Sequence, residues 1–160
     1  MPVHSAGLLL YRVDASPEVL IAHMGGPFWA AKDEGAWSIP KGEYDPDSET
    51  PLDAALREFE EELGVAPPSG PPAELGTWAY SSGKRITVFV ADGAGFDASD
   101  FVFGEFELEW PPRSGRMQSF PEVDRVEWMP LTDARSKLVK GQRPALDALE
   151  ARLAEASGVA

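Results

Sequence analysis

The sequence contains no cysteine among its 160 residues. Without thiols the chain can form neither a disulfide nor a thiolate zinc site, and it has no cysteine nucleophile. Basic residues are also scarce, because 14 lysines and arginines stand against 27 aspartates and glutamates and leave a formal net charge of −13. This charge argues against partners such as nucleic acids and anionic membranes. A small anionic substrate stays compatible with it where metal ions and a few local bases reverse the field.

Long apolar runs are missing as well. Segments such as residues 6–11 are far too short to span a bilayer, and no basic and apolar signal segment precedes them. We therefore expect a cytoplasmic protein with no membrane partner. No glycine-rich phosphate loop is present, since Gly25-Gly26 signals only a turn. The length predicts a single domain over residues 1–160, large enough to bury a hydrophobic core.

Residues 51–63 carry the clearest helix pattern in the chain. Thr50 is a candidate N-cap, Pro51 suits the first helical position, and Asp53 completes a spacing similar to a capping box. Gly64 is the expected stop. Apolar residues recur between these ends at steps of three and four, which gives an amphipathic helix of about three and a half turns.

Several acidic residues lie at the end of this helix where negative charge destabilises it most. Glu60, Glu61 and Glu62 occupy its last turn, where the helix dipole favours cations. Glu58 stands three and four residues before Glu61 and Glu62, so these three carboxylates crowd on one face, whereas Glu60 points away from them. A solvated acidic face is the plain interpretation. A bound divalent cation is the alternative, and hard oxygen ligands of this kind suit Mg²⁺ or Mn²⁺.

Residues 57–65, Arg-Glu-Phe-Glu-Glu-Glu-Leu-Gly-Val, resemble the end of the Nudix box, Arg-Glu-apolar-x-Glu-Glu-x-Gly-apolar. Glu49 stands eight residues before Arg57, as the box requires. The box places a glycine six residues before that glutamate, where this chain has Glu43, and the nearest glycine is Gly42. One extra residue in a loop is accommodated at little cost. We therefore expect a longer turn within residues 44–47.

The resemblance, which runs over the box Gly42–Val65 and weakly over most of the chain, implies a fold and a reaction. The implied fold is α+β, a Nudix-type α/β/α sandwich with a mixed β-sheet and the box helix packed on it. The implied reaction is Mg²⁺-dependent pyrophosphohydrolysis of a nucleoside diphosphate linked to another moiety, as in a nucleoside triphosphate or a dinucleoside polyphosphate. In it a water activated by metal attacks phosphorus. Many relatives form dimers, so a homodimer is a further expectation.

Candidate roles follow for individual residues. The catalytic candidates are Glu61, Glu58, Arg57 and Glu49; Glu61 and Glu58 are equally placed as the general base, while Arg57 would orient the acids with Glu49 as its partner. The metal candidates are Glu58, Glu61, Glu62 and, from outside the box, Glu122, with Glu109 or Glu107 as alternatives. The substrate-binding candidates are Lys41, Lys84, Arg113 and Arg116.

Lys41 is the strongest of these bases because of its context. Residues 37–42, Trp-Ser-Ile-Pro-Lys-Gly, resemble the segment before the box in Nudix enzymes that act on dinucleoside polyphosphates and diphosphoinositol polyphosphates. Two other interpretations stay open: a Nudix-like module that binds or regulates without hydrolysis, and an acidic interaction protein that carries the motif by chance.

The remaining pattern predicts strands around the box helix. We expect strands at residues 3–12, 18–23, 74–81, 85–91, 106–110 and 123–129, irregular chain at residues 92–100, a long polar loop at residues 111–121, and closing helices at residues 131–140 and 144–156. The two strands around Ser82-Gly83 should form a hairpin.

Overall fold

The fold is built around strand β1 (Val3–Val13) of the computed structural model, which describes residues 3–81, 83–96 and 101–156. Along one edge β1 pairs in parallel with β6 (Lys84–Asp92). The other edge is shared by two antiparallel strands: β4 (Lys41–Tyr44) covers His4–Gly7, and β2 (Pro17–Met24) covers Leu10–Val13. The two strands that share this edge separate near the middle of β1, and the cavity described below lies between them.

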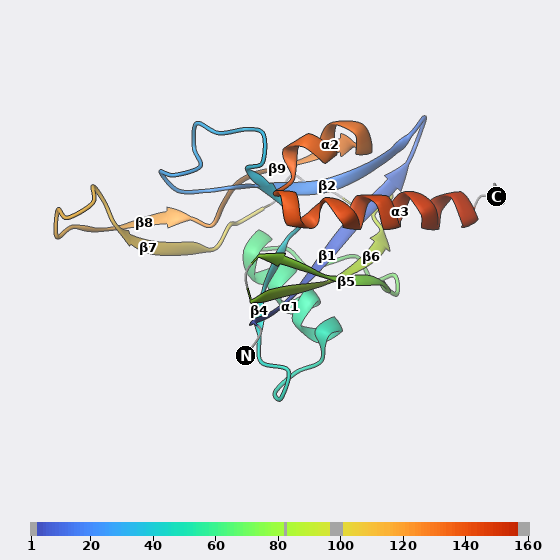
Figure 1. The fold of residues 1–160 in the computed structure, drawn as a ribbon, viewed down its shortest axis with the longest axis horizontal. Coiled ribbons are helices and arrows are strands. Elements are labelled where there is room, and N and C mark those ends of the chain that lie inside the picture. The colour runs from blue at the N-terminus through green and yellow to red at the C-terminus, as the bar shows by residue number, and fades with distance from the viewer. Residues whose placement is uncertain (1–2, 82, 97–100, 157–160) are drawn as a thin grey trace.

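These strands belong to a seven-stranded mixed sheet (Figure 1). Its path runs β3-β2-β1-β6-β5, with β4 paired to β1 and β9 paired to β2. The remaining bounds are β3 (Trp37–Ser38), β5 (Ala73–Ser81) and β9 (Val123–Pro130). A separate two-stranded sheet, β7 (Glu105–Glu109) and β8 (Met117–Pro121), projects from the main body at the left of the view.

Helices cover both faces of the large sheet. Helix α1 (Pro51–Leu63) buries Ala54, Ala55, Phe59 and Leu63 on one face. On the other face lie α2 (Leu131–Lys137), the 3₁₀ helix η1 (Lys140–Gln142) and α3 (Arg143–Ala156), packed on alternate residues of the same strands. The α/β/α sandwich with a mixed sheet, expected from the sequence, is therefore confirmed. Within the described residues, no helix combines the length and the apolar character needed to cross a membrane.

The ends of α1 are set by its own sequence. The Thr50 side chain accepts a hydrogen bond from Asp53 N (3.1 Å), and Pro51 is the first helical residue. At the other end Gly64 takes a left-handed conformation (φ 73°) that an L side chain rarely adopts, and its N–H donates to Glu60 O (2.8 Å). The last carbonyls are satisfied from outside the helix, because Val102 N and Gly104 N donate to Leu63 O and Glu62 O.

Two predictions of secondary structure are wrong in part, and one strand was not predicted. The expected loop over residues 111–121 contains β8, which pairs with β7 so that Phe120 stands opposite Phe106. The expected helix over residues 131–140 ends at Lys137, because Leu138 is extended and forms a parallel bridge with Trp37. Residues 41–44, which the sequence left without an element, form a strand. The β5–β6 hairpin is present, although Ser82 lies outside the described residues, as do 97–100 of the expected irregular segment.

Candidate active site

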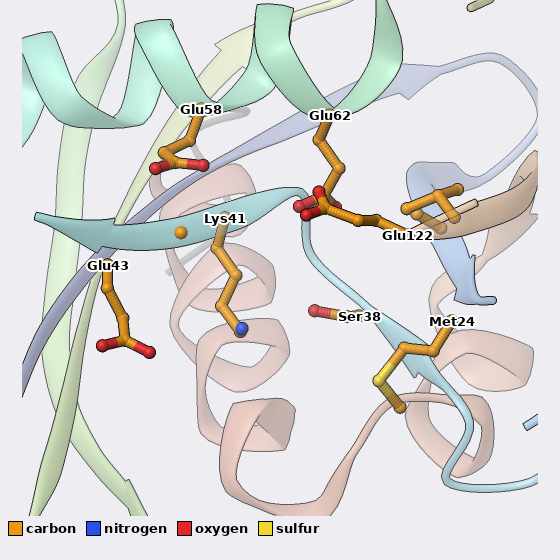
Figure 2. Close-up of a pocket in the computed structure, with 10 residues that line it drawn as sticks. Met24, Ser38, Lys41, Glu43, Glu58, Glu62 and Glu122 are labelled. Atoms are coloured by element: carbon orange, nitrogen blue, oxygen red, sulfur yellow. The ribbon is translucent and has the colours of Figure 1, made fainter. Parts of the chain in front are cut away.

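A cavity of about 420 Å³ opens where β2, β4 and the last two turns of α1 meet (Figure 2). It is lined by Ala22, Met24, Ser38, Lys41, Gly42, Glu43, Glu58, Glu62, Glu122 and Val123. The acidic side chains Glu58, Glu62 and Glu122 lie along its upper wall in the figure, and Lys41 and Ser38 lie below them. Four residues that the sequence singled out, Lys41, Glu58, Glu62 and Glu122, are thus brought together.

Glu62 is the most perturbed acid of the cavity. Its carboxylate points toward that of Glu122. Burial, more than the negative charges of Glu122 and Glu58, raises the pKa of Glu62 to about 8, while the ammonium of Lys41 and a hydrogen bond from the Lys41 backbone N–H act in the opposite direction. An acid held in this way is costly to ionise unless a cation compensates it.

Glu58 lies one helical turn before Glu62 and is mostly buried, with 17% of its side chain exposed. Burial is the main cause that raises its pKa, and the Arg57 guanidinium opposes this rise. The carboxylate rests directly against the backbone of Gly42, since a β-carbon built on that glycine would overlap it. Gly42 pairs with Ala6 of β1, so the missing side chain permits α1 to approach β4 closely.

Glu122 reaches the cavity from the junction between β8 and β9. Its carbonyl accepts a hydrogen bond from Gly25 N (2.9 Å), and its own N–H donates to Gly104 O (2.7 Å). Gly104 in turn donates to Glu62 O (3.3 Å), so one short segment ties Glu122 to the end of α1. The alternatives Glu107 and Glu109 lie on β7 and do not line this cavity.

Arg57 joins the carboxylates of the box into one network. Its Nε donates to both oxygens of Glu49 (3.2 and 3.1 Å), and Nη2 forms a further ion pair with Glu49. Its Nη1 donates to Glu58 Oε1 and to Glu61 Oε2, each at 3.0 Å. Hydrogen bonds to Glu49 raise the pKa of Arg57 and lower that of Glu49. The guanidinium, which does not itself line the cavity, therefore helps to fix the Glu58 carboxylate.

Besides Arg57 and Glu49, four further candidate residues do not line the cavity. The Glu61 side chain is 59% exposed and is paired with Arg57. Lys84 begins β6, where it stands opposite Val3. Arg113 and Arg116 are exposed near the tip of the β7–β8 hairpin. The backbone N–H of Arg113 donates a hydrogen bond to Glu109 Oε1 (3.0 Å). Arg113 and Arg116 were expected in a long loop, and the structure places them in a projecting β-hairpin instead.

Sequence reasoning missed several residues of the cavity wall: Met24, Ser38 and Glu43. Ser38 stands within the segment 37–42 that drew attention to Lys41, but nothing in its spacing indicates which way the hydroxyl points. Glu43 stands two residues after Lys41 on β4, so the two side chains share one face of the strand. The sequence could indicate this only if residues 41–44 were already known to form a strand.

The donor set fits a hard divalent cation. All candidate ligands are carboxylate oxygens, which Mg²⁺ prefers, and Glu62 is held close to Glu122 with a raised pKa. A cation between them would remove the electrostatic cost of ionising both. Within the described parts of the chain no three acidic or histidine side chains are already gathered as a complete ligand set. Waters and substrate phosphates would therefore supply the remaining ligands, as is usual for Mg²⁺.

Comparison with known families decides the assignment. The model of the NUDIX domain matches residues 1–149. The chain belongs to the Nudix family. With every acid and the arginine of the box present, it is a Nudix hydrolase, an enzyme that cleaves phosphoanhydride bonds.

Solved structures show the same fold at low sequence identity. An Ap4A hydrolase of C. elegans in a binary complex is 23% identical, with a TM-score of 0.63, 96% of this chain and 98% of that chain covered. The NUDIX domain of Shewanella oneidensis NrtR, complexed with ADP ribose, is 17% identical, with a TM-score of 0.62, 96% and 89% covered. A mutT/nudix family protein from Listeria innocua is 15% identical, with a TM-score of 0.61, 100% and 99% covered.

Proposed function

We propose that this Nudix hydrolase is a Mg²⁺-dependent pyrophosphohydrolase that cleaves a nucleoside diphosphate linked to another moiety, such as a nucleoside triphosphate or a dinucleoside polyphosphate. The observation that carries the proposal is the meeting of Glu58, Glu62 and Glu122 with Lys41 in one cavity. Mg²⁺ held by carboxylates of this cavity, with waters and phosphate oxygens completing its coordination, would neutralise the phosphates and lower the pKa of a bound water. Lys41 supplies the positive charge that a polyphosphate needs on the opposite wall.

Side chains of the protein would take up the proton of the attacking water and position the acid that does so. Glu58 is our first candidate for the base that takes the proton of the attacking water, because it lies in the cavity and its pKa is raised. A water oxygen forms the new bond to phosphorus while the bridging P–O bond breaks. Arg57, itself paired with Glu49, positions the Glu58 carboxylate through a hydrogen bond. Glu61, on Arg57 in this structure, is the second candidate base or ligand.

Metal binding can be tested without knowing the substrate. Titrating MgCl₂ into chelator-treated protein should raise the melting temperature, because a ligand at a hundredfold excess over its Kd stabilises the folded state by about 2.7 kcal/mol. Hydrolysis should then be assayed with dinucleoside polyphosphates, nucleoside triphosphates, nucleotide sugars and diphosphoinositol phosphates. A flat melting temperature with no turnover would contradict the proposal. Saturable binding of a nucleotide without turnover would favour a binding or regulatory module instead.

Glu61 and Glu60 give a matched pair, because they are neighbouring exposed acids of α1 that point in different directions. Glu61→Gln should lower hydrolysis by roughly a hundredfold or more if the acid leaves Arg57 to act in the cavity, since lost charge stabilisation of about 3 kcal/mol has that effect. Glu60→Gln should be silent, because its side chain is exposed and lies outside the cavity. Steady-state kinetics of both variants at saturating Mg²⁺ would measure this. Equal activity in the two variants would remove Glu61 from the site.

A further inference from the structure

Ser38 lies on the wall of the cavity that faces the acids, and its hydrogen-bonding role is fixed by its neighbours. The residue is only 7% exposed, and its side chain is directed into the cavity beside Lys41 (Figure 2). Its hydroxyl contacts two protein groups: the carbonyl of Ile39 at 2.8 Å and the side-chain amide of Gln142 at 3.0 Å. These two contacts determine what Ser38 can offer a ligand.

The partner of Ser38, Gln142, is 1% exposed and lies in η1, 104 residues away along the chain. Its Oε1 accepts a hydrogen bond from Ile39 N (2.8 Å). A backbone N–H can only donate, so the oxygen of the amide must face Ile39 and the NH₂ group must face Ser38. The orientation of this amide therefore follows from the chemistry of its partners.

A break in backbone pairing explains why a glutamine stands here. Trp37 forms a parallel bridge with Leu138, and Val139 N donates to Trp37 O (2.9 Å). In a continued parallel ladder Ile39 N would donate to the next carbonyl of that strand, Val139 O. The chain instead turns into η1, and Val139 O accepts from Gln142 N (3.0 Å). The Gln142 side chain replaces the lost acceptor, so segment 37–41 is held on both sides.

The proton of Ser38 is accounted for by the same contacts. A hydroxyl has one proton to donate, and the Ile39 carbonyl can only accept it. The amide NH₂ of Gln142 occupies one acceptor position of the oxygen. What Ser38 can still present is an acceptor. Ionised phosphate oxygens are also acceptors, so Ser38 is unsuited to bind them, whereas a hydroxyl group of a ligand fits.

We propose that Ser38, held by Gln142, accepts a hydrogen bond from a ribose hydroxyl of the substrate, so that the cavity takes a ribonucleoside polyphosphate with its sugar on this wall and its phosphates toward the acids and Lys41. The assignment rests on the proposed function of the same cavity and goes beyond it by naming the sugar. A site that binds a substrate hydroxyl leaves a buried acceptor unpaired when the analogue lacks that group, and discriminates against it.

The test compares ATP with 2′,3′-dideoxy-ATP, which lacks both ribose hydroxyls. For the wild-type enzyme with Mg²⁺ we expect kcat/KM to be about tenfold higher, and Kd by calorimetry about tenfold lower, for ATP, as one lost hydrogen bond in a buried site would cause. In Ser38→Ala the two nucleotides should become equivalent. Equal constants for the wild type, a preference that persists in Ser38→Ala, or failure of ATP to bind would each overturn the inference.

The ratio of the two nucleotides separates recognition from damage to the fold. Ser38→Ala also leaves the Gln142 NH₂ without its partner. The resulting loss of stability reduces activity and affinity toward the two nucleotides alike, so it does not change their ratio. Thr87→Val is the matched control, because it removes a buried hydroxyl contact in the sheet (Thr77 Oγ1, 2.9 Å) away from the cavity and should keep the preference. If Ser38 accepted a hydrogen bond from Lys41 instead, Ser38→Ala would weaken the binding of ATP and of its analogue equally, and the preference for ATP would persist. Absence of turnover would count against the proposed function. The ratio of the Kd values for the two nucleotides would still test the role of Ser38.

Discussion

Glu62→Gln is expected to lower Mg²⁺-dependent hydrolysis by roughly a thousandfold, which corresponds to a loss of about 4 kcal/mol in transition-state stabilisation. The change keeps the size of the side chain and its ability to accept the hydrogen bond from the Lys41 N–H, but removes the negative charge that faces Glu122. The increase in melting temperature with MgCl₂ should vanish in the same variant. Initial rates and melting curves at matched metal concentrations measure both effects.

The same substitution should stabilise the metal-free protein. In the folded chain the pKa of Glu62 is raised to about 8 from an ordinary value of 4.5, so between these two pH values the folded state holds a proton that the unfolded state has released. Stability then falls as pH rises through this window, by about 1.4 kcal/mol per pH unit at most. Removing the acid removes this slope. Glu62→Gln should therefore unfold at higher denaturant concentration than the wild type at pH 7 without metal, and at a similar one at pH 4.5.

The prediction is specific because Glu62→Gln should change activity and metal-free stability in opposite directions. A variant that is merely misfolded would lose both activity and stability, whereas loss of a metal-binding acid lowers activity and raises the stability of the metal-free state. Glu60→Gln, on the exposed side of the same helix, controls for helix propensity. Wild-type activity in Glu62→Gln, or a metal-free protein of unchanged stability at pH 7, would contradict the assignment of Glu62.

The box helix could be predicted closely because its signals are local. Thr50, Pro51 and Gly64 act on the backbone within a few residues of themselves, so the bounds 51–63 follow from spacing alone. The spacing also placed Glu58 and Glu62 on one face. It could not separate Glu61 from them, because the position of that side chain depends on which carboxylates Arg57 reaches, and one of these, Glu49, comes from outside the helix.

Contacts between distant segments account for what the sequence could not indicate. Ser38 and Gln142 stand 104 residues apart, and their hydrogen bond exists because α2 ends early to pair Leu138 with Trp37. Local propensity favoured a longer helix there, and tertiary pairing overrode it. The β7–β8 hairpin has a similar cause: residues 117–121 alternate too weakly to predict a strand, and only pairing with β7 makes them one. Arg113 and Arg116 are exposed beside its tip for that reason.

Gly42 joins the sequence pattern to the geometry of the site. It stands one residue outside the position that the Nudix box assigns to glycine, yet it is the residue on which the Glu58 carboxylate rests. The turn that follows is closed by Asp45, whose side chain accepts from Asp47 N (2.9 Å) and from the Ser48 hydroxyl (3.0 Å). This turn lies in the segment where the sequence predicted the extra residue, and it leaves Gly42 paired with Ala6.

Gly42→Ala should therefore reduce hydrolysis by roughly a hundredfold while leaving the fold intact, since displacing one catalytic group typically costs about 3 kcal/mol in transition-state stabilisation. The three atoms nearest the new methyl group all belong to the Glu58 carboxylate, which is the end of a flexible side chain. Glu58 must then turn away from β4 and from Arg57 Nη1. We expect kcat to fall and the melting temperature of the metal-free protein to change by only a few degrees, which steady-state kinetics and thermal unfolding would measure.

Gly70→Ala supplies the control, because a β-carbon at that position meets no atom within 4 Å and the backbone there is not left-handed. Its activity and stability should both stay close to those of the wild type. If Gly42→Ala kept full activity, Glu58 would not need its present position and could not be the base proposed above. If Gly42→Ala failed to fold, the contact would serve packing between α1 and β4. Loss of activity in a stable protein is the result that connects the displaced glycine to catalysis.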